Sequence, residues 1–157
     1  MSVTFRNVTA NPTDPVAGWP TEAVQAALER GDIEEWRRLT AEINRRPWGR
    51  TARQVEEVLS HSRPYGVAEL MESVIARARA RTEDDERRTV AAEVRQAIAD
   101  SGLARSEFAA RIGTSTSRLS TYATGKVAPA ATLMLRIRRL LADTDRPSTP
   151  RSPERGH

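Results

Sequence analysis

Cysteine is absent from the 157 residues, which excludes a disulfide framework, a thiolate nucleophile and a cysteine-ligated zinc or iron site. Long apolar runs are missing too, so no stretch resembles a membrane span, and the first residues lack the pattern of a secretory leader. We therefore expect a cytoplasmic protein without membrane contact. The length allows one ordinary domain or two small ones, and it leaves no room for a large enzyme scaffold with a deep cleft.

Groups suited to catalysis or metal binding are sparse. His61 stands beside Ser62, but no acid in the sequence is placed to orient it, and His157 ends a tail rich in proline and serine. The acids from Glu83 to Glu86 would point in different directions on a helix, and they suit a helix start better than a cation. We predict a protein that is not an enzyme, with no catalytic residue, no metal site and no cofactor.

Helical patterns follow one another along most of the chain, which predicts an all-α fold. Residues 1–20 form an irregular arm in which "VTFRNV" is a candidate edge strand, and residues 143–157 form a disordered tail. Between them we place a helical block for dimerisation or partner binding over residues 21–81. A second domain follows over residues 82–142.

The N-terminal block is predicted to hold four amphipathic helices. Thr21 would cap the first helix, with Gly31 as its stop; Asp32 would cap the second, and Pro47 would open the third. A fourth helix would begin near Val67. The expected inward side chains are Val24, Ala27, Leu28, Ile33, Trp36, Leu39, Ile43, Val55, Val58, Leu59, Leu70, Met71, Val74, Ile75 and Ala78.

The apolar stripe lapses at "RTEDDERR". Thr82 with Asp85 would make a capping box, which favours a new helix there, although one long helix from Val67 to Asp100 also fits. The next inward residues are Val90, Val94, Ala97 and Ile98.

From Gly102 to Leu141 the pattern predicts a short helix, a tight turn, a short helix, a loop and a helix. Ser106 would start the first helix, Gly113 permits the turn, Ser115 would cap the second helix and Gly125 would end it. The expected inward residues are Phe108, Ala109, Ile112, Leu119, Tyr122, Leu133, Met134, Ile137 and Leu141.

The second of these helices carries small polar residues where Leu, Glu or Lys would be usual. With Leu119 and Tyr122 inward, its outer side holds Thr116, Ser117, Arg118 and Thr121. Short hydroxyls can donate or accept at base edges, and threonine methyl groups can meet thymine methyl groups. The alternative is a plain surface helix of weak helix formers.

Positive charge concentrates in the same segment. Ser101 to Leu141 contain seven bases and one acid, Glu107, for a net charge of +6, whereas the rest of the chain sums to −2. This favours a polyanionic partner, with nucleic acid first, against a merely solvated basic face. No aromatic platform accompanies the charge, so stacking on single strands is disfavoured.

The stretch "GLARSEFAARIGTSTSRLSTYATGKVAPAATLMLRIRRL" resembles the Cro/C1 (Xre) type helix-turn-helix domain. The residues that fall on the family pattern without a gap are Leu103, Phe108, Ala109, Gly113, Ser115, Leu119, Ser120, Gly125, Lys126, Pro129, Met134 and Ile137. The resemblance implies a five-helix domain in which the helix from Ser115 to Thr124 reads the major groove of DNA.

The same resemblance assigns roles to single residues. Thr116, Ser117 and Thr121 occupy base-facing positions, with Arg118 able to reach a base or a phosphate. The implied phosphate contacts are Arg105, Ser115 and Lys126. Arg105 stands where the family often has Gln, so it keeps a phosphate contact without the usual amide bridge.

One such domain makes few contacts, so we expect a homodimer on a palindromic operator of double-stranded DNA. The N-terminal block could pair chains, bind a protein partner or sense a ligand. Trp19, Trp36 and Trp48 could form a partner-binding patch or belong to the core. The whole arrangement also resembles antitoxins found beside AbiEii-like nucleotidyltransferase toxins, which implies an autoregulating repressor with a toxin partner. A stand-alone regulator and a docking module that has lost DNA binding are the alternatives.

Overall fold

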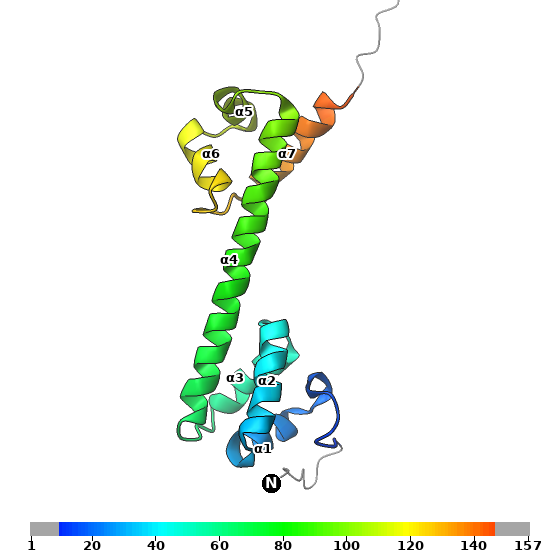
Figure 1. Cartoon of the computed structure of the whole chain (residues 1–157), viewed down its shortest axis with the longest axis vertical. Helices are drawn as coiled ribbons and strands as arrows, with labels where there is room; N and C mark the ends of the chain where they lie inside the picture. Colours follow the sequence, from blue (N-terminus) through cyan, green and yellow to red (C-terminus); the bar gives the residue numbers. More distant parts are fainter. Residues whose placement is uncertain (1–9, 147–157) are drawn as a thin grey trace, which may run out of the picture. The chain divides into compact units, whose positions relative to one another are not determined.

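The computed structural model describes residues 10–146, and these residues are helical without any strand in that range. The all-α prediction is confirmed. The elements, labelled in Figure 1, are η1 Val16–Gly18, α1 Thr21–Arg30, α2 Ile33–Arg45, α3 Arg50–Leu59, α4 Val67–Ser101, α5 Arg105–Ile112, α6 Thr116–Ala123 and α7 Ala131–Thr144. None of the helices in the described range is both long and apolar enough to cross a membrane.

The chain divides after Glu83 into two compact units, here called the N-terminal unit and the C-terminal unit. Each has a hydrophobic core of its own. The core of the N-terminal unit comes from η1, α1, α2, α3 and the first turns of α4, and its fully buried members include Leu28, Leu39, Val55 and Met71. Spacing of apolar residues at helical period therefore predicted most of this core, but Ile33, expected inward, is the first residue of α2 and is 60% exposed.

Trp19 ties the arm to the N-terminal unit. Its side chain is fully buried, its indole Nε1 donates a hydrogen bond to the carbonyl oxygen of Asp14 at 3.0 Å, and Gln54 Nε2 donates to the Trp19 carbonyl oxygen at 2.8 Å. The segment predicted as irregular thus contains η1 and a core residue. Trp19 has no exposed surface and so cannot belong to a surface patch, whereas Trp36 is partly buried and Trp48 is 46% exposed. The proposed edge strand over residues 3–8 lies outside the described residues.

Helix starts in the N-terminal unit follow the chain's capping chemistry only in part. Asp32 caps α2 as predicted, because its side chain accepts from backbone amides of the first turn and Glu35 bonds back to the Asp32 amide. Thr21 is the first residue of α1 and caps nothing, since Pro20 takes the cap position. Pro47 does not open α3, which begins three residues later at Arg50.

Helix α4 runs unbroken through the segment where a new start was favoured. Thr82 Oγ1 donates to the carbonyl oxygen of Ala78 at 3.0 Å, so Thr82 lies inside the helix and the capping box is wrong. Ion pairs three residues apart, Asp84 with Arg87 and Asp85 with Arg88, support the helical course of the acidic run. The one-helix alternative is the correct one.

Leu70 is a second difference on α4. It was expected in the core but is 47% exposed, whereas Met71, Ile75 and Ala78 are buried as predicted. A stripe drawn from apolar residues alone included Leu70 because it is adjacent to Met71, although the two point about 100° apart around the helix axis.

The C-terminal unit places α5, α6 and α7 around the last turns of α4 (Figure 1). Its core contains the predicted Phe108, Ala109, Ile112 and Leu119, all essentially without exposed surface. Within the described residues after Glu83 there are four helical segments, where the family resemblance implied five. Helix α5 begins at Arg105 after Ala104, so Ser106 does not start it.

The end of α7 also differs slightly from the prediction. The helix continues to Thr144, two residues into the segment expected to be a disordered tail. The remainder of that expectation, over residues 147–157, lies outside the described residues.

Candidate nucleic-acid interface

The turn between α5 and α6 sets the direction of α6. Gly113 adopts φ +79°, a left-handed conformation that glycine tolerates without a Cβ penalty, and the amide of Thr114 donates to the carbonyl oxygen of Ala109 at 2.9 Å. Ser115 follows as the N-cap, with its Oγ accepting from the amide of Arg118 at 3.1 Å. Both residues do what the sequence predicted.

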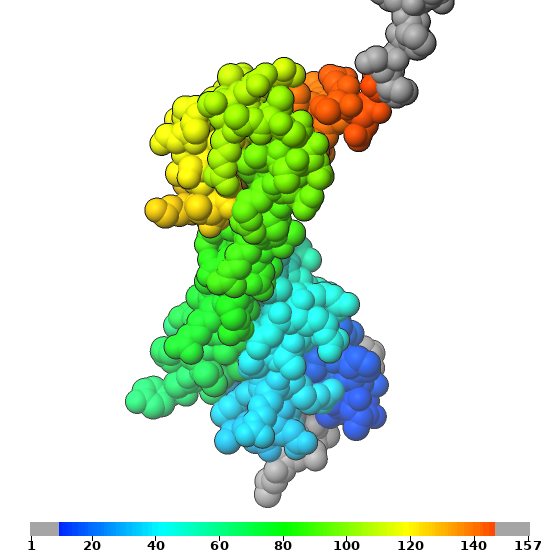
Figure 2. Space-filling view, turned by 45° about the horizontal axis from the view of Figure 1, so that its top comes forward, coloured from blue at the N-terminus to red at the C-terminus, as the bar shows by residue number. Residues whose placement is uncertain are grey.

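Helix α6 has one buried side and one uncovered side. Leu119 and Ala123 are buried against the core, and Tyr122 is partly buried. On the opposite side Thr116, Ser117 and Arg118 are exposed. Figure 2 shows the atoms of α6 and the following loop at the molecular surface.

Thr121 differs from the other three candidate base-contacting residues. It is half-buried, and its Oγ1 donates to the carbonyl oxygen of Arg118 at 2.6 Å. The hydroxyl proton is thus directed into the helix, while the oxygen can still accept a hydrogen bond.

The cations of the basic segment separate into two groups. Three are engaged inside the unit: Arg111 pairs with Glu107 at 2.9 Å, Arg138 with Glu93 at 3.3 Å, and Arg136 donates to the carbonyl oxygen of Ile112 at 3.3 Å. Four others form no ion pair within residues 10–146: Arg105, Arg118, Lys126 and Arg139.

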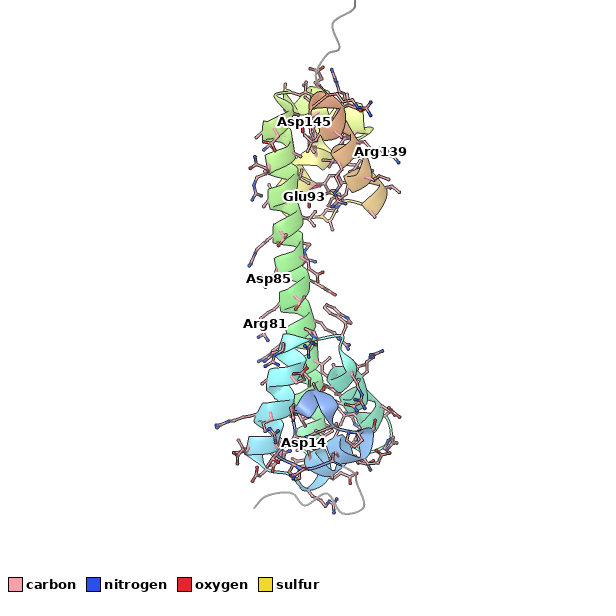
Figure 3. All side chains as sticks on the ribbon, turned by 90° about the vertical axis from the view of Figure 1, so that its right-hand side faces the viewer. Asp14, Arg81, Asp85, Glu93, Arg139 and Asp145 are labelled. Carbon is pink, nitrogen blue, oxygen red and sulfur yellow. The ribbon has the colours of Figure 1, made fainter. Side chains whose placement is uncertain are left out.

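This second group is spread over several elements: Arg105 begins α5, Arg118 lies on α6, Lys126 follows α6 and Arg139 lies on α7. It includes all three cations singled out from the sequence, and it adds Arg139, which sequence reasoning did not assign. Figure 3 labels Arg139 on α7. No acid lies between Ser115 and Lys126, so nothing in that stretch opposes an approaching anion.

The candidate phosphate contacts occupy both ends of α6 and the start of α5. Arg105 is the exposed first residue of α5. Ser115 accepts with its oxygen, so its hydroxyl proton remains free to donate, and the first amides of α6 have no acceptor within the helix. Lys126 is fixed through its backbone amide, which donates to the carbonyl oxygen of Thr121 at 3.1 Å.

Elsewhere, the structure brings Glu29 to Ser62, a contact that no sequence pattern indicated. Ser62 Oγ donates to Glu29 Oε1 at 2.6 Å, and this bond, with a second one from Gln25, lowers the pKa of the Glu29 carboxyl. His61 is exposed and takes no hydrogen bond from Ser62. In residues 10–146 no three His, Asp or Glu side chains converge as metal ligands would.

The N-terminal unit carries an open groove of about 370 Å³ between α3 and α4. Leu59 and Ile75 line it, and the ion pairs of Arg63 with Glu72 and of Arg79 with Glu56 lie along it. Hydrogen bonding to Arg63 is the main cause that lowers the pKa of Glu72. The two ion pairs give the groove no net charge.

No protein-family model, curated protein or solved structure matches the chain.

Proposed function

We propose that the protein is a sequence-specific regulator of transcription that binds double-stranded DNA with α6 in the major groove and acts as a repressor. The observation that carries the proposal is the uncovered side of α6. It presents the hydroxyls of Thr116 and Ser117 and the guanidinium of Arg118. The stretch from Ser115 to Lys126 contains no acid. Side chains of this kind suit the donor and acceptor pattern of base edges.

The surrounding cations support the same proposal. Arg105, at the start of α5, and Lys126, just after α6, have no ion-pair partner among the described residues and so keep their full charge for a phosphate backbone. A surface adapted for docking another protein would instead expose apolar side chains at the middle of the patch. Positions 116, 117 and 118 on α6 are polar or charged.

One C-terminal unit offers a small contact surface, so selective binding calls for two copies on a two-fold operator. Half-sites would then lie one helical turn apart, about 34–36 Å. The N-terminal unit, with its own core, would serve dimerisation or bind a protein partner. We retain the antitoxin as the biological setting of the proposal, and a toxic nucleotidyltransferase encoded by the neighbouring gene is the observation that checks it.

Fluorescence anisotropy of the full chain on labelled DNA from its own upstream region, at several salt concentrations, tests DNA binding. Thr116→Ala and Ser117→Ala should reduce the preference for this DNA over a scrambled duplex while leaving the salt dependence unchanged. Arg105→Ala and Lys126→Ala should weaken binding to both duplexes and reduce the slope of log K against log salt by about 0.9 each.

Arg53→Ala provides a matched control, because Arg53 is an exposed arginine of the N-terminal unit. It should bind like the wild type. Equal affinity of the wild type for specific and scrambled DNA at physiological salt would refute sequence-specific recognition. Identical effects of all four variants would refute the division into base and phosphate contacts.

A further inference from the structure

Arg95 reaches from α4 to the end of α6. Its Nη1 donates to the carbonyl oxygen of Ala123 at 2.6 Å, and Ala123 is the last residue of α6. Carbonyls in the last turn of a helix have no amide partner within the helix, and a cation there also meets the negative end of the helix dipole. Arg95 therefore satisfies and stabilises the C-terminal end of the helix that carries the candidate base contacts.

The chain after α6 passes closely over the same part of α4. A Cβ added to Gly125 would lie 3.6 Å from Ala91 Cβ and 3.7 Å from the carbonyl oxygen of Arg87. The backbone at Gly125 is therefore close enough to α4 for an added methyl group to touch it. Gly125 takes φ +78°, which lets the chain turn at this point. At this junction Arg95 supplies a hydrogen bond from α4 to the end of α6.

This junction is linked to the candidate DNA-binding residues. The amides of Lys126 and Val127 donate to the carbonyl oxygen of Thr121 at 3.1 and 3.3 Å. A shift of the backbone at Ala123 would therefore move both Thr121 and Lys126. One of these is a candidate base contact and the other a candidate phosphate contact.

We propose that Arg95 is a positioning residue for DNA recognition: it holds the C-terminal end of α6 against α4 and does not itself contact DNA. The proposal rests on the function proposed above. Without the guanidinium the end of α6 would sample other positions, and DNA would bind only the correctly placed fraction. The apparent dissociation constant rises by the inverse of that fraction.

Salt dependence separates this role from a phosphate contact. A cation that neutralises a phosphate contributes about 0.9 to the slope of log K against log salt, because its binding releases a counterion. A cation bonded to a backbone carbonyl within the protein contributes nothing to that slope. The same loss of affinity thus has two distinguishable causes.

The experiment compares the full-length wild type with Arg95→Ala, Arg95→Lys, Lys126→Ala and Arg88→Ala in salt-dependent anisotropy on one specific duplex. Arg88 is the matched control, since it lies on the same helix, is exposed and, within residues 10–146, forms its ion pair with Asp85, at 3.5 Å. We expect Arg95→Ala to bind about tenfold more weakly with an unchanged slope. Lysine at position 95 should restore most of the affinity, because it can still donate to the carbonyl, and Arg88→Ala should match the wild type.

Amide hydrogen exchange supplies a readout that does not depend on DNA. In Arg95→Ala the amides of Thr124, Gly125 and Lys126 should exchange faster, while those of α5 keep their protection. A merely structural role would speed exchange throughout the C-terminal unit. Uniform loss of protection would therefore overturn the proposal.

Two further results would overturn it. Wild-type affinity of Arg95→Ala would show that the bond does not position α6, and a slope reduced by about 0.9 would show that Arg95 contacts a phosphate. If circular dichroism shows that Arg95→Ala does not fold, the affinity and salt dependence of Arg95→Gln are measured in its place, since glutamine keeps a donor without the charge. Its slope must equal that of the wild type. Failure of the wild type to bind DNA would instead refute the proposed function, which is measured first.

Discussion

Gly113 should be the least replaceable glycine of the C-terminal unit, and Gly113→Ala is the change that tests it. The residue sits at φ +79°, and an added Cβ would lie 3.1 Å from Arg136 Nη1. The guanidinium that it would displace donates to the carbonyl oxygen of Ile112 at 3.3 Å. The substitution therefore strains the backbone and also weakens a hydrogen bond at the end of α5.

The substitution Gly102→Ala separates the backbone strain from the loss of the hydrogen bond. Gly102 has a similar φ of +66°, but no atom lies within 4 Å of the position that its Cβ would take. Left-handed backbone costs an alanine about 1–2 kcal/mol. We expect Gly102→Ala to lose only this amount. Gly113→Ala should lose about 1 kcal/mol more, the usual net worth of one hydrogen bond.

Urea unfolding of the full chain measures the difference, because its three tryptophans all precede residue 49 and report on the N-terminal unit. The tryptophan transition should stay in place in both variants, while the circular dichroism transition of the C-terminal unit moves to lower urea. In an Arg136→Ala background the two glycine substitutions should cost the same, which gives a coupling of about 1 kcal/mol. Equal costs in the wild-type background would refute the role assigned to Arg136.

Three further changes have definite expected results. Gly31→Ala should destabilise the N-terminal unit by about 1–3 kcal/mol, measured by tryptophan fluorescence, because its Cβ would overlap the Ala27 carbonyl oxygen. Ser62→Ala should raise the pKa of Glu29 towards its ordinary value of 4.5, measured by NMR titration. Since the folded pKa is lowered, the stabilisation is present above pH 4.5, is lost as pH falls through the folded pKa, and is smaller in the variant. Leu119→Ala should cost about 2–5 kcal/mol in urea unfolding, because it leaves a cavity under α6.

Each of these changes has a control in the chain. Gly18→Ala should leave stability unchanged, since no atom lies within 4 Å of its Cβ position. Ser60→Ala should leave the Glu29 titration unchanged, because Ser60 Oγ bonds the carbonyl oxygen of Glu57. Leu135→Ala should cost far less than the Leu119 change, as Leu135 is 44% exposed. A control that behaves like its partner variant would contradict the stated cause.

Helix faces were predictable because burial follows the spacing of apolar residues, as Leu39 and Ile43 in α2 and Phe108 and Ile112 in α5 show. Helix starts were less predictable, because several residues can satisfy the same cap. At Thr82 a capping pattern favoured a new helix, whereas ion pairs one turn further on favoured a continuous one. The structure has the continuous helix. Residue types near a possible helix start do not by themselves tell whether the helix begins there or continues.

The candidate site also has features that the sequence predicted and one that it did not. The exposure of Thr116 and Ser117 was predictable, because it follows from an inward Leu119 on the same helix. The bond from Arg95 to Ala123 was not, since it joins residues 28 positions apart and depends on how α4 and α6 pack. Arg95 also precedes the basic segment, which begins at Ser101.

The bond that Thr121 makes to its own helix would restrict which bases it can select. While the proton is directed at the Arg118 carbonyl, the side chain accepts, so it favours amino groups over the keto oxygens of guanine or thymine. Adenine N6 and cytosine N4 are the major-groove amino groups. In the DNA complex proposed above, a selected-operator library should therefore be enriched in adenine or cytosine at the position facing Thr121.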